Sequence, residues 1–304
     1  MIKGTEDTRY AYVNGIVRAR ESRLLTKSHF DRLIAGTIES FTTILSDTAY
    51  GQQKDIPKGF EMEIIDVNNF FRKYCLTPET QLFIDWPEQI HNLKVKLKEG
   101  SEDIMYAQAS SDVETWPEVS DAVEQYAVEK DPFILSSNLD KILCKYLSET
   151  SHFAPFFEKY YQLSFDLENI RSFFRARHFE NSREIFVQVY IPYGSIDMRL
   201  FLDNLSSQHD ALARSFFITP YMRIVDKGSS YIDEHHSFLI LERLIEEMRL
   251  EFLLSARKMT FGIEPLFSYY HFRMSEIKKL RQVYWGKLNE VPIDELKESI
   301  PDVW

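Results

Sequence analysis

Glycine and proline, the residues that most often end helices and form turns, are scarce in this sequence, with 10 and 11 among 304 residues. This usage is below average, and it favours long helices over many strands joined by tight turns. Hydrophobic residues make up 44% of the chain and aromatic residues 14%, which is enough to build a large buried core. The sequence therefore predicts a folded, all-α protein.

Amphipathic patterns place helices along the first third of the chain. A long first helix is expected within residues 9–25. Two short helices follow as a hairpin, the first starting at Ser28 with Asp31 and the second at Thr37. Thr77 and Pro78 are typical of the N-cap and first residue of a helix, which is expected to end at Gly100.

The rest of the chain is also expected to be helical. Helices are predicted over residues 121–131, 137–149, 151–180, 195–217 and 233–259, and from Glu264 and Pro265 onward.

A few segments are expected to interrupt the helices. They are a loop with Gly51, Pro57 and Gly59, a polar connector over 101–120 in which Thr115 and Pro117 start a new helix, a turn at Tyr193 and Gly194, and a loop over 226–230. The segment EIFVQVYIP, residues 184–192, alternates β-branched and aromatic residues and predicts one short strand.

Charge and cysteine usage limit the possible partners. The formal net charge of -11 repels phosphate backbones and anionic lipid, so nucleic acid is not expected as a partner. Cys75 and Cys144 both fall in apolar helical patterns, as reduced core thiols do, which fits the cytosol. No apolar run reaches the roughly 20 residues that span a bilayer. No direct membrane span is expected, and attachment to a membrane would come through another protein.

One amphipathic pattern occurs three times. PEQIHNLKVKLK starts at residue 87, LENIRSFFRAR at 167 and MSEIKKLRQVYWGK at 274. Each has an aliphatic residue, Leu93, Ile170 or Ile277, and a basic end. Any one copy would be an ordinary helix whose charge order suits its dipole. Three copies indicate a single domain, 1–304, of three divergent units over about 1–110, 111–192 and 193–304, with a ring-like or funnel-like, approximately threefold body.

The spacing of the three copies is unequal. Asn92, Asn169 and Glu276 occupy the matching position, and the interval from the second to the third is longer than that from the first to the second. The third copy also has an acid where the other two have an amide.

The residues at both ends of the chain resemble those of a known family. YAYVNGIVRARESRLLTKSHFDRLIAG with LSDTAYG, and GIEPLFSYYHFRMSEIKKLRQVYWGKLNEVP, are similar to the C subunit of V-type and archaeal-type rotary ATPases, the counterpart of the eukaryotic d subunit. Weaker similarity continues through DLENIRSFFRAR and IPYGSID. Tyr193 departs from the pattern, because such turns often carry a second glycine there. The motif positions carried over are Tyr12, Arg18, Glu21, Tyr50, Asn169, Arg171, Arg175, Glu264, Pro265, Gly286 and Lys287.

The resemblance implies a non-catalytic central-stalk subunit without a cofactor. Family members are all-helical funnels that sit on the membrane rotor ring and receive the central shaft, and they turn with the rotor during proton or sodium transport. The implied partners are the shaft subunits of the ATPase head and the rotor ring. The implied location is the cytoplasmic side of the membrane, peripheral through the complex.

Two alternatives from other classes stay open. Glu88 and His91 have the Glu-x-x-His spacing of di-iron carboxylate bundles, and Asp233 with His236 offers a second half, so a metal-binding helical-bundle enzyme is the main rival. A helical scaffold unrelated to ATPases is the other. Neither a phosphate-binding glycine loop nor a serine-hydrolase motif occurs, and the residues around the two cysteines do not suit a nucleophile.

Overall fold

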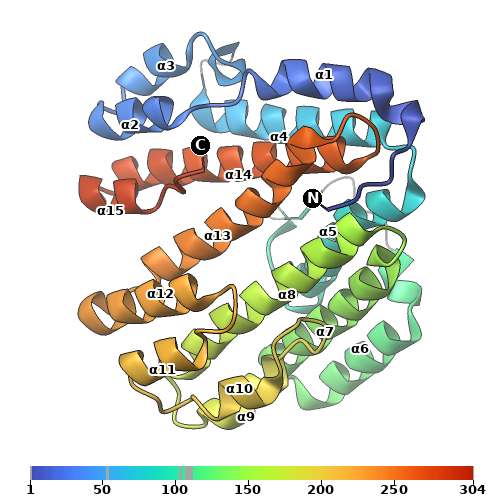
Figure 1. Cartoon of the computed structure of the whole chain (residues 1–304), viewed down its shortest axis with the longest axis vertical. Helices are drawn as coiled ribbons and strands as arrows, with labels where there is room; N and C mark the ends of the chain where they lie inside the picture. The colour runs from blue at the N-terminus through green and yellow to red at the C-terminus, as the bar shows by residue number, and fades with distance from the viewer. Residues whose placement is uncertain (1, 53–54, 103–104, 107–111, 304) are drawn as a thin grey trace. The chain divides into compact units, whose positions relative to one another are not determined.

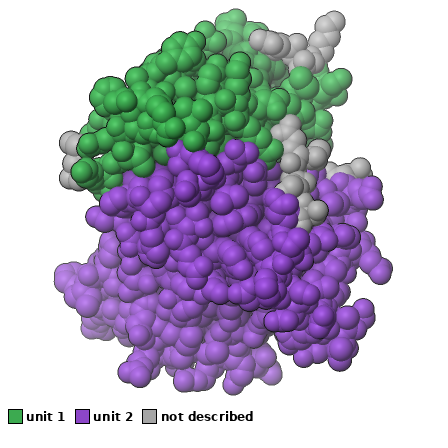
Figure 2. Space-filling view, turned by 90° about the vertical axis from the view of Figure 1, so that its right-hand side faces the viewer, with its two compact units in different colours: residues 1–76, 223–304 green, residues 77–222 purple. Residues whose placement is uncertain are grey.

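The computed structural model describes residues 2–52, 55–102, 105–106 and 112–303. Every regular element in these ranges is a helix, which confirms the all-α fold (Figure 1). The chain divides into two compact units (Figure 2). Unit 1 combines both ends of the chain, residues 1–76 and 223–304, and unit 2 is the continuous segment 77–222.

Unit 1 is organised around α14, Glu264–Leu288, its longest helix. Helix α14 lies along α4, Ile56–Tyr74, and also packs against α1, Ala11–Glu21 (Figure 1). Large side chains such as Phe41, Phe60 and Tyr284 meet edge to face in this core. The other helices of the unit are α2 Lys27–Ala35, α3 Ser40–Leu45, α12 Met222–His235, α13 Leu239–Leu254 and α15 Ile293–Glu298.

Unit 2 is organised around α7, Pro132–Ser151, which packs against several of the other helices. Helix α7 contacts α5, Pro78–Leu97, on one side and α8, Pro155–Ala176, on another. Phe173 on α8 is fully buried among the rings of Phe186, Phe201 and Phe216, whose burial drives this part of the fold. The remaining helices are α6 Pro117–Glu129, α9 Ser182–Val189, α10 Met198–Leu202 and α11 His209–Ser215.

Several predicted helix starts are confirmed. Thr77 is the N-cap of α5 and Pro78 its first residue, and Glu264 with Pro265 opens α14. Pro117 opens α6, although Trp116 rather than Thr115 is the N-cap. These starts were predictable because the N–H that proline lacks is one that the first turn of a helix leaves without a partner. Part of the predicted connector, residues 103–104 and 107–111, lies outside the described residues.

The predicted strand over residues 184–192 is wrong. Ser182–Val189 is helix α9, in which Phe186 is fully buried. Ile185, Phe186 and Val189 recur at a spacing that suits one face of a helix as well as it suits a strand. Packing of Phe186 on Phe201, with ring centroids 5.1 Å apart, outweighs the strand propensity of the β-branched residues.

The helix predicted over residues 233–259 is broken, and the loop predicted over 226–230 is helical. Helix α12 runs through 226–230 and ends at His235, and His236 takes a positive φ of 51° before α13 begins. Gly228 does not mark a loop but a close approach of two helices. A Cβ there would lie 2.8 Å from Leu241 Cδ1 on α13.

Three predicted boundaries near the N-terminal end are also corrected. Pro57 and Gly59 belong to α4 rather than to a loop, because Asp55 is the N-cap and Pro57 lies in the first turn. Thr26, not Ser28, is the N-cap of α2. Cys75 follows α4 instead of lying within it.

A helix that crosses a bilayer must be both long and apolar. Over the part of the chain that the structure describes, none of the helices meets both conditions.

Two glycines provide a matched test of the turn after α3. A Cβ on Gly51 would lie 2.5 Å from the Ser46 main chain, whereas a Cβ on Gly15 would meet nothing within 4 Å. Gly51→Ala is therefore expected to lower the free energy of unfolding by about 1–3 kcal/mol through overpacking. Gly15→Ala, in exposed helix, should raise it by about 0.5–1 kcal/mol. Urea unfolding followed by circular dichroism measures both, and similar effects of the two changes would contradict the described turn.

A partly buried histidine gives unit 1 a pH dependence. Burial, and then the nearby Arg249, lowers the pKa of His271 on α14 to about 3. The unfolded chain takes up this proton near the ordinary value, so stability is expected to fall as pH drops from about 6.5 towards 3. In His271→Leu this part of the loss should vanish. Urea midpoints of both proteins at about pH 7.5 and about pH 5 separate it from packing effects, and an equal loss in both would refute it.

Candidate functional site

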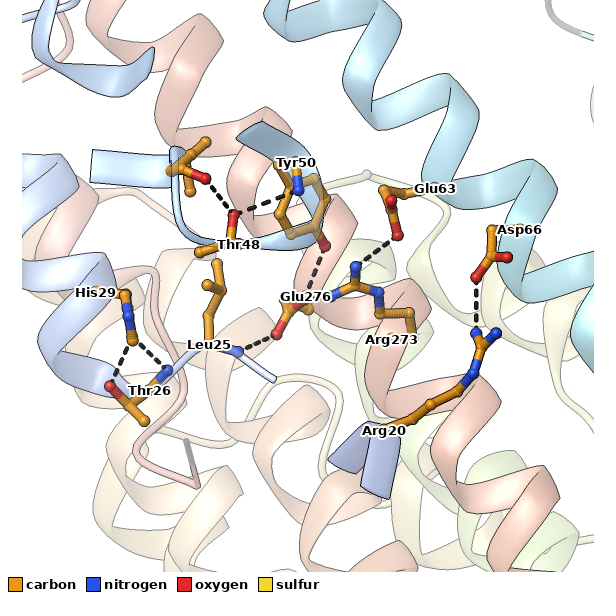
Figure 3. A network of polar contacts seen from close by, with 11 residues as sticks. Arg20, Leu25, Thr26, His29, Thr48, Tyr50, Glu63, Asp66, Arg273 and Glu276 are labelled. Carbon is orange, nitrogen blue, oxygen red and sulfur yellow. Dashed lines mark hydrogen bonds and ion pairs between the residues drawn. The ribbon is translucent and has the colours of Figure 1, made fainter. Parts of the chain in front are cut away.

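Glu276 on α14 is the centre of a buried polar cluster in unit 1 (Figure 3). Its carboxylate accepts hydrogen bonds from the Leu25 N–H at 2.5 Å and from the Tyr50 hydroxyl at 2.7 Å. Arg273, one turn earlier, forms ion pairs with Glu276 and, at 2.6 Å, with Glu63 of α4. The cluster thereby ties α14 to chain segments 251 and 226 residues away.

The pKa values of Glu276 and Tyr50 depend on burial and on their partners in this cluster. Burial raises the pKa of Glu276, while Arg273 and the hydrogen-bond donors lower it in part. Burial also raises the pKa of Tyr50 well above its ordinary value, so its hydroxyl stays a donor. The Arg273 guanidinium lies 4.5 Å over the Tyr50 ring. Removal of Arg273 would leave Glu276 as an uncompensated buried charge, which is strongly destabilising.

The segment that this cluster holds, residues 25–50, is called the first strap and contains α2 and α3. At its start, the Thr26 N–H donates to His29 Nδ1 at 3.1 Å in the first turn of α2. At its end, Thr48 Oγ1 donates to Leu45 O at 2.6 Å and accepts from the Tyr50 N–H at 3.3 Å. This turn directs the Tyr50 side chain towards Glu276.

A second strap, residues 196–221, is held in unit 2 by Asp166 on α8. Asp166 is fully buried and accepts from the Ile196 N–H at 3.0 Å and the Tyr221 hydroxyl at 2.8 Å. The Ser195 N–H and hydroxyl donate to it at 2.8 and 2.5 Å. Burial and the carboxylate of Asp166 raise the pKa of Tyr221, which keeps this hydroxyl protonated.

The two straps match in length and in their final turn. The interval from Leu25 to Tyr50 equals that from Ile196 to Tyr221. Thr219 repeats the contacts of Thr48, since its Oγ1 donates to Phe216 O at 2.7 Å and accepts from the Tyr221 N–H at 3.3 Å. The first and last residues of each strap therefore bind one carboxylate.

Each strap is also tethered by a cation near the end of its long helix. Lys287 donates to Ile34 O at 2.6 Å, and Arg177 donates to Ser207 O at 2.5 Å. Lys287 follows Glu276 by the same interval as Arg177 follows Asp166. Glu276 thus corresponds to Asp166 in its contacts, and not to Asn169 as the sequence comparison had paired it.

Asn169 and Asn92 make a different contact that is common to α8 and α5. Asn169 donates to Ile191 O and accepts from its N–H, both at 2.8 Å. Asn92 makes the same pair of bonds to Tyr106, at 2.9 and 2.8 Å. An amide side chain suits this role because it presents a donor and an acceptor side by side.

Three further motif positions fasten the N-terminal segment of unit 1. Arg18 pairs with Glu21 at 2.7 Å and donates to two main-chain carbonyls, of Ala256 and Met259. Glu264 is fully buried and accepts from the Thr5 N–H at 2.5 Å. Burial raises the pKa of Glu264.

The last motif positions differ in role. Pro265 lies in the first turn of α14, and Gly286 lets Leu296 of α15 approach, since a Cβ there would lie 2.6 Å from Leu296 Cδ2. Arg171 pairs with Glu168. Tyr12 and Arg175 are exposed, Tyr12 at 73%.

The residues of the rival metal site are divided between the two units. Glu88 and His91 belong to unit 2, while Asp233 and His236 belong to unit 1. Within the described ranges, no three His, Cys, Asp or Glu side chains are grouped as a metal ion would require. The geometry gives the metal-enzyme alternative no support.

Comparison with known proteins assigns the family. A sequence profile of the ATP synthase (C/AC39) subunit family matches residues 77–299. The chain belongs to this family. It is also similar to the C subunit of the V-type sodium ATPase of Enterococcus hirae, with 22% identity over 327 aligned positions that cover 97% of this chain and 99% of the relative. These findings confirm the resemblance that the sequence indicated.

Asp166, Tyr221 and Arg273, which bind or pair within these two clusters, were not among the residues predicted from the sequence. The available signal was the repeated Thr-x-Tyr at a fixed distance, Thr48 with Tyr50 and Thr219 with Tyr221. Because the segments between are dissimilar, only the hydrogen bonds make the correspondence visible.

Removal of the tyrosine hydroxyl from each strap tests separately how each buried carboxylate holds its strap. Tyr50→Phe and Tyr221→Phe each take a hydrogen bond from a buried carboxylate, so we expect the free energy of unfolding to fall by about 1.5–3 kcal/mol. Hydrogen exchange should show lost protection over residues 25–50 in the first variant and over 196–221 in the second.

A surface pair of the same chemistry is the control. The Tyr231 hydroxyl donates to exposed Glu298 at 2.8 Å. Tyr231→Phe should therefore change the free energy of unfolding by less than about 1 kcal/mol. Loss of protection in both straps of either buried variant would contradict independent ties.

Proposed function

We propose that this chain is the non-catalytic central-stalk subunit that joins the rotating shaft of an ATPase head to the membrane rotor ring. Its proposed partners are the shaft subunits and the ring, on the cytoplasmic side of the membrane, in an enzyme that moves protons or sodium ions. The observation that carries the proposal is membership of the ATP synthase (C/AC39) subunit family, matched over residues 77–299. The printed name of the Enterococcus hirae relative, which assigns it to a V-type sodium ATPase, supports it.

The physical character of the ties also supports a mechanical role. A part that transmits torque must keep its shape under load, and buried charge-assisted hydrogen bonds resist separation more than exposed ones do. Glu276 and Asp166 each fasten a whole strap to a long helix in this way. Such a body needs stiffness and interfaces rather than a group poised for chemistry.

We also propose that this body consists of three divergent helical repeats, about 1–110, 111–192 and 193–304. These repeats differ from the two compact units described above. The matched straps support repetition within the chain, because unrelated segments would have no reason to share the same spacing between their bonded ends. Helix α5 supports a third, shorter version, since Gln89 Oε1 accepts from the Val113 N–H at 3.2 Å. The funnel shape of the body stays a prediction from the family resemblance.

Depletion of the chain from the purified membrane complex tests the proposed coupling. ATP hydrolysis by the head should continue, ATP-driven ion transport should fall to background, and re-addition of the chain should restore transport. The purified chain alone should bind the shaft subunits and the ring, and its ATP hydrolysis should stay at background.

Two results would refute this function. One is ion transport that persists without the chain. The other is a correctly folded chain, verified by circular dichroism, that binds neither shaft nor ring.

A further inference from the structure

The two straps allow positions required by the fold to be distinguished from positions that are free to vary. Residue by residue, Leu25 to Tyr50 aligns with Ile196 to Tyr221 without a gap. Phe30 and Phe201 are both fully buried at the same position, as are Leu45 and Phe216. At these two positions both straps place a buried apolar residue.

At the tip before the final turn, the two straps differ. The first strap has Ser46 and Asp47, which lie at a surface turn as polar residues are expected to. The second has Phe217 and Ile218, which are 71% and 93% exposed. Since the same turn forms with serine and aspartate, the fold does not require this exposed apolar pair.

The charge beside the tip also differs. The Phe217 N–H donates to Arg214 O at 3.2 Å, so Arg214 lies one turn before the apolar pair. The matching bond of the first strap joins Ser46 to Thr43, an uncharged residue. Arg214 Nε donates to Asp210 O at 3.0 Å, and among the described residues no carboxylate pairs with its guanidinium.

Arginine beside a protruding aromatic and aliphatic pair is the composition of an interface anchor. We propose that Arg214, Phe217 and Ile218 form a knob that inserts into an apolar socket, with a carboxylate at its rim, on a protein subunit of the rotary ATPase. The proposal rests on the function proposed above, and it names a contact surface for that function. Charge complementarity selects the socket, because Arg214 needs an acid and the pair needs an apolar cavity. An anionic membrane is disfavoured by the net charge of -11 and by the acidic Asp210 nearby.

The sequence of the first strap supplies the test variant. In F217S/I218D the second strap receives the tip of the first, which the same turn accommodates. The variant should fold, with a circular dichroism spectrum and a urea midpoint no lower than those of the wild-type protein. A clear loss of stability would overturn the proposal, because the pair would then be structural.

Binding is measured with purified membrane complex from which the chain has been removed. Wild-type chain should rebind, while F217S/I218D and R214T should each bind at least about tenfold more weakly. The reciprocal variant S46F/D47I places the apolar pair on the first strap and should bind as the wild type does. Unchanged affinity of F217S/I218D, or an equal loss in S46F/D47I, would overturn the knob.

Vesicles distinguish a lipid surface from a protein socket. Wild-type chain should not bind vesicles of phosphatidylcholine with phosphatidylglycerol. Vesicle binding that F217S/I218D abolishes would replace the protein socket with lipid. Failure of the wild-type chain to rebind the complex would refute the proposed function itself, whereas rebinding that F217S/I218D leaves intact would refute the knob alone.

Discussion

The buried carboxylates of Glu276 and Asp166 determine how this chain holds together over long sequence distances. Helices are stabilised by local hydrogen bonds, but nothing local fixes where a strap of short helices lies against a long one. A buried carboxylate can accept several bonds at once, and each of these two takes up donors from opposite ends of a strap. Leaving it partly satisfied would be costly, so the strap has one favourable position. Apolar contacts fill the space beneath, as Phe30 and Phe201 do, but they are less directional.

The helical class and many helix starts could be predicted because they depend on local chemistry. Thr77 with Pro78 marks a start by cap geometry alone, wherever the helix packs later. The errors came where tertiary contacts decide. Ser182–Val189 is helical because Phe186 enters an aromatic core, and Gly228 lies inside α12 because α13 passes close to it. Neither neighbour can be identified from the surrounding sequence, so propensity favoured a strand and a loop.

The family resemblance singled out motif residues in the sequence, but it did not identify their partners. Tyr50, Glu264 and Lys287 were singled out, and each proves to bind a segment from the opposite end of the chain. The sequence pairing of Asn169 with Glu276 used apolar neighbours as its guide, whereas the hydrogen bonds pair Asp166 with Glu276. An apolar stripe repeats every turn of a helix, so it fits several registers equally well. A buried carboxylate that is followed at a fixed interval by a tethering cation fits only one register of the two helices.

The two straps are held to their long helices by different electrostatic interactions. Glu276 has Arg273 as a countercharge, while Asp166 is surrounded by neutral donors from Ser195, Ile196 and Tyr221. Both solutions satisfy a buried carboxylate, one by an ion pair and the other by hydrogen bonds to its charged form. Among the described side chains, only Glu276 of these two carboxylates has a countercharge, but the spacing between the two bonded ends of the strap is the same in both cases. The geometry of the bonded strap is therefore more constant than its electrostatics. A constant geometry suits the mechanical role proposed above, because torque is transmitted by fixed positions, and either kind of bond supplies them.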